Sequence, residues 1–288
     1  MAENSSQKKR KREVCQRCTR PTPQACICLA LPPKPLHLRS TRVIVLQHPN
    51  ESKRKNRSLP LIELCLACDE SSGEKDCSSS NGSSELMAEH TDFTFNTTIA
   101  RWWGKEVVHP LVWKIVNNPD EPLMLCFPSD DSIPVQDALE TIRFTSPGKN
   151  TKTSDSTHTR IQSETNEQNL SELDSKKKIN IIFIDGTWKY AKEMEKKTTQ
   201  NGGWPKHVIR IKISNFEKDF KPRRFDIRNP PSQSHLSTAE CIAQVLKVVE
   251  DKGTELYGAL MRPLDLMVQQ WHSFQNDKKK LKMNDKTI

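Results

Sequence analysis

A carboxylate at the end of a buried strand is the first candidate for chemistry in this sequence. Residues 179–184 form an almost unbroken apolar run, which predicts a strand buried on both faces. Asp185 follows it, and Gly186 and Thr187 can form a tight turn and a cap for a helix over residues 188–197. Open α/β sheets bind ligands at this edge, because loops diverge there around a cavity. Asp185 is therefore either a ligand-facing carboxylate or a simple turn residue.

A second strand end also carries ionisable side chains. Residues 42–47 form a short β-branched run that predicts another strand. The run ends at His48, and Glu51, Lys53 and Arg54 follow closely. A histidine, a carboxylate and two cations at a strand end are suited to an anionic ligand such as a phosphate.

A loop and a helix start near the C-terminus could complete an anion site. Residues 224–231 contain two prolines next to Arg228, which predicts a rigid loop. Ser237 and Glu240 have the spacing of a capping box, and the helix that they open runs to about residue 252. Because backbone amides point outward at a helix start, residues 237–238 should favour an anion.

Four cysteines near the N-terminus have metal-ligand character. Cys15, Cys18, Cys26 and Cys28 lie within fourteen positions. An intracellular protein keeps its thiols reduced, so a dense cluster indicates a metal rather than disulfides, and four thiolates suit tetrahedral zinc. The alternative is a set of unliganded or redox-active thiols.

A further cysteine pair has the same short spacing. Cys65 and Cys68 lie on or next to an apolar run over residues 59–67, which predicts a helix. Since no second pair follows nearby, packed thiols are the preferred interpretation.

The charge of the chain indicates a polyanionic partner. The formal net charge is +9, and nucleic acid is the default candidate. Residues 8–12 form a basic run typical of a nuclear import signal. We therefore expect the protein in the nucleus, with a further fraction in the cytoplasm. The same run could serve as a phosphate-binding tail. Further basic clusters occur at residues 53–57, 221–224 and 278–280.

The composition indicates a core interrupted by polar inserts. Only 34% of the 288 residues are hydrophobic, and residues 69–98 and 146–178 are strongly polar, which predicts flexible inserts. No apolar run is long enough to span a bilayer, so we expect a soluble, intracellular protein without membrane contact. The predicted organisation is a disordered basic tail (1–14), a zinc-binding cysteine cluster (15–30), a catalytic domain (31–275) and a basic tail (276–288).

The remaining patterns predict an α/β fold with a parallel sheet. Further strands are expected over residues 123–127 and 207–213. A final helix is expected over about residues 255–274, interrupted by Pro263.

Five motifs in this order resemble the DTW-domain family, and in particular its eukaryotic tRNA-uridine aminocarboxypropyltransferases. They are the four cysteines, His48-Pro-x-Glu51, Asp185-x-Thr-Trp188, Ile227-Arg228-x-x-Pro231 and Leu236-Ser-Thr-x-Glu240. The resemblance covers about residues 15–275. It implies a SPOUT-like, knotted parallel sheet, S-adenosylmethionine as donor, and transfer of its 3-amino-3-carboxypropyl group to N3 of a uridine in the tRNA D-loop.

The resemblance also implies roles for individual residues. The expected catalytic residues are Asp185, Thr187 and Trp188. The expected donor-binding residues are His48, Glu51, Arg228, Leu236, Ser237, Thr238 and Glu240. One departure is Phe225, which stands where the family often has a tyrosine hydroxyl.

Two mechanisms and two other functions stay open at this point. Asp185 could be the general base that removes the N3 proton, or it could only orient the uracil through a hydrogen bond. Arg228 is the candidate counter-charge for the donor carboxylate. The alternatives to this transferase are a SPOUT-type RNA methyltransferase and a non-catalytic, zinc-containing tRNA-binding protein.

Overall fold

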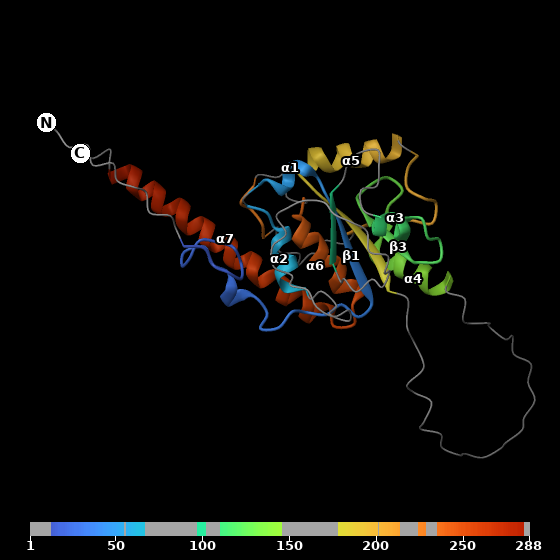
Figure 1. The fold of residues 1–288 in the computed structure, drawn as a ribbon, viewed down its shortest axis with the longest axis horizontal. Helices are drawn as coiled ribbons and strands as arrows, with labels where there is room; N and C mark the ends of the chain where they lie inside the picture. The colour runs from blue at the N-terminus through green and yellow to red at the C-terminus, as the bar shows by residue number, and fades with distance from the viewer. Residues whose placement is uncertain are drawn as a thin grey trace, which may run out of the picture.

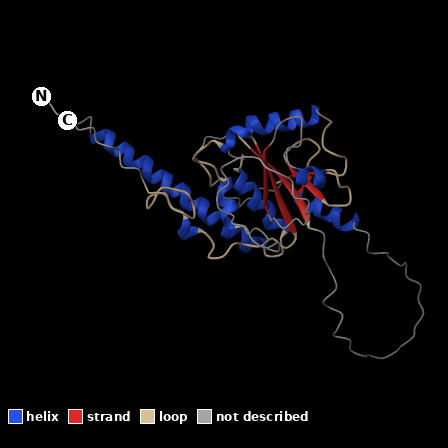
Figure 2. Ribbon diagram, viewed as in Figure 1, coloured by secondary structure: helices blue, strands red, loops and turns tan. Residues whose placement is uncertain are grey.

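A parallel sheet runs through the centre of the protein (Figures 1 and 2). It has six strands in the order β2-β1-β5-β3-β6-β4. The strands are β1 (Thr41–Gln47), β2 (Thr97–Arg101), β3 (Leu123–Cys126), β4 (Ile133–Pro134), β5 (Ile179–Asp185) and β6 (Ile209–Lys212). The predicted α/β class with a parallel sheet is therefore confirmed.

The structure, a computed structural model, describes eight segments of the chain. They are residues 13–54, 56–66, 97–101, 110–145, 178–200, 202–213, 224–228 and 235–284. The predicted basic run over residues 8–12, Cys68 and nearly all of the two polar inserts lie outside these segments. The predicted end of the first insert was wrong, since Thr97 already belongs to β2.

Helices cover both faces of the sheet because its central strands are apolar on both sides. Val43 and Val45 of β1 face one buried cluster, whereas Ile44 and Leu46 face the other. The first face is covered by α2 (Leu59–Cys65), α4 (Val135–Thr145), α6 (Thr238–Val249) and α7 (Gly253–Asn284). The second face is covered by α3 (Pro110–Val116) and α5 (Trp188–Gln200), and two short helices, η1 (Cys28–Ala30) and α1 (Pro49–Ser52), complete the set.

The strand order places a topological switch at β1 and β5. From β1 the chain moves outward to β2, and it then crosses to β3 on the other side before β5 enters between β1 and β3. In parallel sheets of this kind the loops diverge at such a point and leave a crevice beyond the carboxyl ends of the strands. Asp185 lies at that edge, in register with Gln47 of β1.

The last helix differs most from expectation. α7 runs without a break from Gly253 to Asn284, so the predicted interruption at Pro263 and the predicted end near residue 274 were wrong. Leu260 and Leu264 are fully buried on either side of the proline, and this packing outweighs the one missing hydrogen bond. The lysine-rich segment after residue 275 contains no glycine or proline and continues the helix to residue 284, so most of the predicted basic tail over residues 276–288 is helical.

None of the helices within the described segments, α7 included, is long and apolar enough to cross a membrane.

The packing of α7 against the sheet can be tested with two leucines. Leu264 is 0% exposed and Leu29 is 98% exposed. Leu264→Ala should lower the free energy of unfolding in urea by about 2–5 kcal/mol, because it leaves a cavity in the core. Leu29→Ala, the same truncation in solvent, should change it by less than about 0.5 kcal/mol. Equal effects of the two changes would show that α7 does not form part of the core.

Candidate active site

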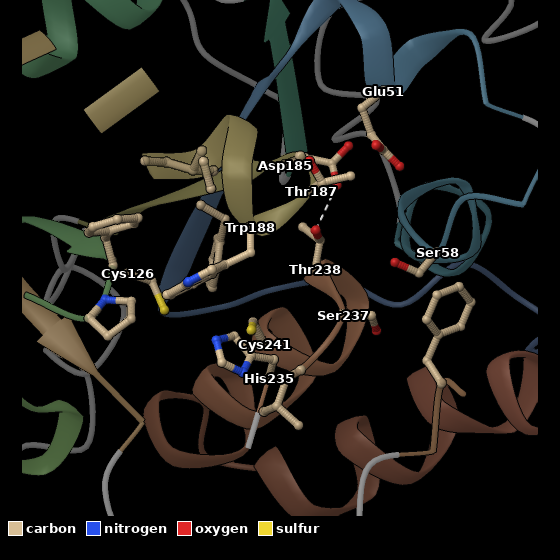
Figure 3. A pocket seen from close by; sticks show the side chains of 18 of the residues that line it. Glu51, Ser58, Cys126, Asp185, Thr187, Trp188, His235, Ser237, Thr238 and Cys241 are labelled. Atoms are coloured by element: carbon tan, nitrogen blue, oxygen red, sulfur yellow. Dashed lines mark hydrogen bonds between the residues drawn. The ribbon is translucent and has the colours of Figure 1, made fainter. Parts of the chain in front are cut away.

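A cavity of about 660 Å³ opens beyond the carboxyl ends of β5, β3 and β6. Its lining includes eight of the residues expected from the sequence, namely Glu51, Asp185, Thr187, Trp188, Arg228, Leu236, Ser237 and Thr238. Figure 3 shows Glu51 and Asp185 at one end of this cavity and Cys126, His235 and Trp188 at the other. The cavity is thus polar at one end and aromatic at the other.

Asp185 is a buried carboxylate with a hydrogen bond on each oxygen. It is 5% exposed. Gln47 Nε2 donates to Oδ2 over 2.7 Å, and the Thr238 hydroxyl donates to Oδ1 over 2.6 Å (Figure 3). The two donors come from β1 and from the first turn of α6, so two separate segments hold the carboxylate that β5 carries. These contacts show that Asp185 is a buried carboxylate held beside the cavity, and not a simple turn residue.

The surroundings of Asp185 act on its pKa in opposite directions. Burial raises the pKa of this carboxyl, and the nearby charge of Glu51 raises it further. The hydrogen bonds from Thr238 and Gln47 and the charge of Arg228 lower it, but the net direction is upward. A carboxylate with a raised pKa is a better proton acceptor near neutral pH than an exposed aspartate.

Arg228 is held in an ion pair at the polar end of the cavity. Its Nη1 donates to Glu51 Oε1 over 2.5 Å and its Nη2 donates to the Asn56 carbonyl over 2.6 Å. Arg54 Nε lies 3.4 Å from the other oxygen of Glu51, whose side chain is only 3% exposed. The guanidinium is therefore oriented by Glu51, which balances its charge.

Glu240 binds backbone and lies behind the cavity. The predicted capping box is confirmed, with Ser237 as the N-cap of α6. One oxygen of Glu240 accepts from Ser237 N over 2.7 Å, and the other accepts from the amides of Arg224 and Phe225 over 2.7 and 3.2 Å. Glu240 thereby ties the helix start to the loop of Arg228, so it positions the site rather than lining it.

The amides at the start of α6 are less open to an anion than the sequence indicated. Ser237 N donates to Glu240, Ala239 N donates to the Ser58 hydroxyl over 3.4 Å, and Glu240 N donates to the Ser237 hydroxyl over 3.4 Å. At this helix start the cavity is lined by side chains, including the Thr238 hydroxyl that binds Asp185.

His48 likewise supports the site from behind. Its ring stacks on Tyr190 at 4.0 Å between centroids, and its Nδ1 accepts from Asn50 N over 3.1 Å. Burial lowers the pKa of His48. A Cβ atom at Gly186 would lie 3.2 Å from Tyr190 Cβ, which is a tight contact, and 3.5 Å from His48 Cβ, which is an ordinary one, so a side chain here would require a small shift of Tyr190.

The other end of the cavity is aromatic. Trp188 stacks on Phe127 with 6.0 Å between ring centroids and meets the His235 ring edge-on at 4.6 Å. Thr187 precedes it as the cap of α5 and accepts from Tyr190 N over 3.4 Å. A flat aromatic wall of this kind can pack against a heterocyclic ring.

Sequence reasoning missed several lining residues and one positioning residue. Gln47 was seen only as the end of a strand. The sequence signal was a polar residue closing an apolar run, and its register with Asp185 comes from the pairing of β1 with β5. His235, Cys126, Cys241, Lys189 and Lys212 line the cavity without belonging to any motif singled out in the sequence.

The four cysteines of the N-terminal cluster meet as expected. The Sγ atoms of Cys15, Cys18, Cys26 and Cys28 all lie within 4.8 Å of one another. Cys15 and Cys28 are 3.5 Å apart and Cys18 and Cys26 are 3.7 Å apart. Four sulfurs at about 2.3 Å from a tetrahedral ion would be separated by about 3.8 Å, so the cluster has the dimensions of a metal site. Cys65, by contrast, is fully buried among apolar side chains, as predicted.

The fold and the cavity define a class: an α/β protein with a parallel sheet and a ligand cavity at its topological switch. The family model described as "DTW domain" matches residues 12–272. The chain therefore belongs to the DTW domain family.

Curated relatives extend this similarity. The chain is 26% identical over 265 residues to the tRNA-uridine aminocarboxypropyltransferase 2 of Macaca fascicularis, an alignment that covers 90% of this chain and 63% of the relative. It is 24% identical over 264 residues to the tRNA-uridine aminocarboxypropyltransferase A of Arabidopsis thaliana, covering 90% of this chain and 81% of the relative. The chain thus spans less than two thirds of the macaque protein. No solved structure matches.

The raised pKa of Asp185 predicts how the free energy of unfolding changes with pH. In the folded protein this pKa lies above the ordinary value of 3.8, so ionising the carboxyl costs more in the folded than in the unfolded state. Wild-type stability should fall as the pH rises from about 3.8 through the folded-state pKa. Asp185→Asn removes this decrease, because an asparagine amide does not ionise. The Gln47 amide can turn to accept from the new amide, so the hydrogen bond between them is kept.

The measurement is urea unfolding of both proteins between pH 4 and pH 8, with Asp130→Asn on an exposed turn as the control for removal of one carboxylate. The difference between Asp185→Asn and wild type should move in favour of the variant as the pH rises. A difference that moves in the opposite direction would mean that the hydrogen bonds to Asp185 outweigh its burial.

Proposed function

We propose that this protein is a tRNA-uridine aminocarboxypropyltransferase, which transfers the 3-amino-3-carboxypropyl group of S-adenosylmethionine to N3 of a uridine in the tRNA D-loop. The observation that carries the proposal is the buried, doubly hydrogen-bonded Asp185 at the switch-point cavity of a DTW domain. The names of the curated relatives support the same reaction. The SPOUT-like, knotted class of the fold is part of this proposal.

Asp185 has the position and the environment of a general base. Uridine N3 carries a proton near neutral pH, which must leave before the nitrogen can act as a nucleophile. Gln47 and Thr238 hold the carboxylate so that it needs no reorganisation when it accepts this proton. The N3–carbon bond then forms as the bond between the donor γ-carbon and sulfur breaks, and methylthioadenosine leaves as a neutral thioether.

Arg228 and Trp188 would bind the donor at opposite ends of the cavity. The guanidinium, fixed by Glu51 and by the Asn56 carbonyl, suits a carboxylate such as that of the carboxypropyl group. The aromatic wall of Trp188, Phe127 and His235 suits a heterocycle. Asp185 lies at the same polar end as Arg228 and Glu51, and there it would face the reacting carbon and the uracil.

We also propose that the four-cysteine cluster holds one structural zinc ion. Cys15, Cys18, Cys26 and Cys28 would supply all four ligands, so no position stays open for catalysis. The ion would stabilise the N-terminal segment, because it would hold its four thiolates together. These residues lie far from Asp185 in sequence.

The reaction is tested by its two products. With tRNA and S-adenosylmethionine the protein should yield 3-(3-amino-3-carboxypropyl)uridine and methylthioadenosine. Asp185→Asn should lower turnover by roughly 10²-fold or more with little change in tRNA binding, because the variant keeps the shape of the side chain but loses the base. Mass spectrometry of tRNA nucleosides and chromatography of the donor products provide both readouts.

Other products would assign another function. Methyluridine with S-adenosylhomocysteine would identify a methyltransferase, which attacks the donor methyl carbon instead. Tight tRNA binding without any product would identify a non-catalytic binding protein. Near-normal turnover of Asp185→Asn would leave the transferase in place but would restrict Asp185 to orienting the uracil.

The zinc site is tested by metal content. Purified protein should contain about one zinc ion per chain, and Cys18→Ser should lose it, because three thiolates bind zinc far more weakly. Cys65→Ala removes a buried thiol outside the cluster and should keep the metal. Wild-type protein without zinc, with four thiols that react freely in the folded state, would contradict the proposal.

A further inference from the structure

The exposed apolar side chains gather in one part of the molecule. Among the described residues, the exposed large hydrophobic side chains are Val14, Leu29, Phe274 and Met283, with exposed fractions of 57%, 98%, 37% and 70%. Two lie in the N-terminal knuckle, defined here as residues 13–30, and two lie in the last turns of α7. Clustered apolar exposure of this kind is typical of an interaction surface.

The knuckle and α7 form one connected surface. Gln270 Nε2 donates to the Cys26 carbonyl over 2.9 Å, and Arg20 Nη2 donates to Met267 Sδ over 2.8 Å. Cys18 and Ile27 are buried in the same core cluster as Met267. The knuckle is therefore anchored on α7 just before the segment that carries Phe274.

The end of α7 projects from the domain as an arm. Figure 1 shows this end extending away from the sheet and its covering helices. The α7 arm, defined as residues 272–284, is about 20 Å long at 1.5 Å per residue. It contains four lysines, at positions 278, 279, 280 and 282, and a single acidic residue, Asp277. The arm lies outside the core, so a bound partner would add to the stability that its own helix propensity supplies.

The base of the arm is joined to the cavity. His272 Nε2 lies 2.9 Å from the carboxylate of Asp226, which precedes the cavity residue Arg228 by two positions. In the same loop, Arg224 donates to Asp265 of α7 over 2.6 Å. A molecule bound along the arm would therefore reach the entrance of the cavity beside Arg228.

We propose that the knuckle and the α7 arm form the docking surface for the tRNA, and this rests on the proposed function. Lysines in a row neutralise backbone phosphates, and an exposed aromatic ring such as Phe274 can stack on an unpaired base, which a loop of tRNA presents. The exposed aliphatic side chains can pack against such bases. Phe274 and Lys278 lie on one face of the arm at a spacing of four residues, so both kinds of interaction are offered side by side.

A second copy of the chain is the less suitable partner. In a symmetric dimer the same patch lies on both sides of the interface, so the lysine-rich arms would face each other with like charge. A polyanion complements the arm and the net charge of +9 instead.

The test is a variant with Lys278, Lys279, Lys280 and Lys282 all changed to Gln. A control with the same charge change has Lys114, Arg143, Lys206 and Lys252 changed to Gln, four exposed residues elsewhere. We expect the arm variant to bind tRNA roughly tenfold or more weakly than the control near physiological salt. The slope of log affinity against log salt should fall by about one for each phosphate that the arm no longer neutralises.

Turnover separates docking from catalysis. The arm variant should raise KM for tRNA while kcat and S-adenosylmethionine binding stay at the control values, because the cavity is unchanged. A chain that ends at residue 275 removes the lysines without substituting them and should behave in the same way.

Several outcomes would overturn the docking surface. One is that the arm variant has the same tRNA affinity and the same KM for tRNA as the control. The other is that the wild-type protein sediments as a dimer and the arm variant sediments as a monomer. Failure of the proposed reaction is a separate result, because wild-type protein would then give no aminocarboxypropyl product. The comparison of tRNA binding between the arm variant and the control would still decide the role of the arm.

Discussion

The hydrogen bonds that hold Asp185 connect the elements on which the rest of the site depends. β5 ends at this carboxylate, β1 supplies Gln47 and α6 supplies Thr238, so the two central strands and a covering helix meet at two oxygen atoms. A buried carboxylate without these donors would be strongly disfavoured. The strand order that brings β5 between β1 and β3 is therefore coupled to the formation of a proton acceptor beside a cavity. Gly186 fits this arrangement, because a side chain at the turn would press against Tyr190.

Other buried carboxylates organise the chain around this centre in the same manner. Glu240 binds three backbone amides and joins α6 to the loop of Arg228. Glu250, at the end of α6, accepts from the amides of Arg39 and Ser40 and from the Thr41 hydroxyl, and so fixes the start of β1. Glu51 orients Arg228. In each case one acidic side chain satisfies groups from a distant segment, which gives α6 an anchor at both of its ends and explains why polar residues occur within an otherwise apolar core.

The parts with a proposed binding role differ from the core in their composition. The cavity lies at the sheet edge, where β1 and α6 hold Asp185 through Gln47 and Thr238, and where Glu51 and the Asn56 carbonyl hold Arg228. The knuckle and the α7 arm lie at the periphery. Cys18 and Ile27 anchor the knuckle in the core, whereas Leu29 and the end of the arm face solvent. This division separates a precise chemical site from a broad, electrostatic surface, as a protein that acts on one base of a large polyanion requires.

The features that depend only on neighbouring residues could be predicted from the sequence. The apolar run before Asp185, the capping box of Ser237 and Glu240, the close group of four cysteines and the α/β class follow from local pattern, and the structure contains each of them. Only the tertiary structure decided which side chains meet. Gln47 and Thr238 reach Asp185 through strand register and helix docking, His48 and Glu240 turn away from the cavity to bind other groups, and α7 continues through Pro263 because its flanking leucines are buried. Contacts between residues far apart in sequence depend on the packing of the whole domain, and no local pattern of charge or hydrophobicity records them.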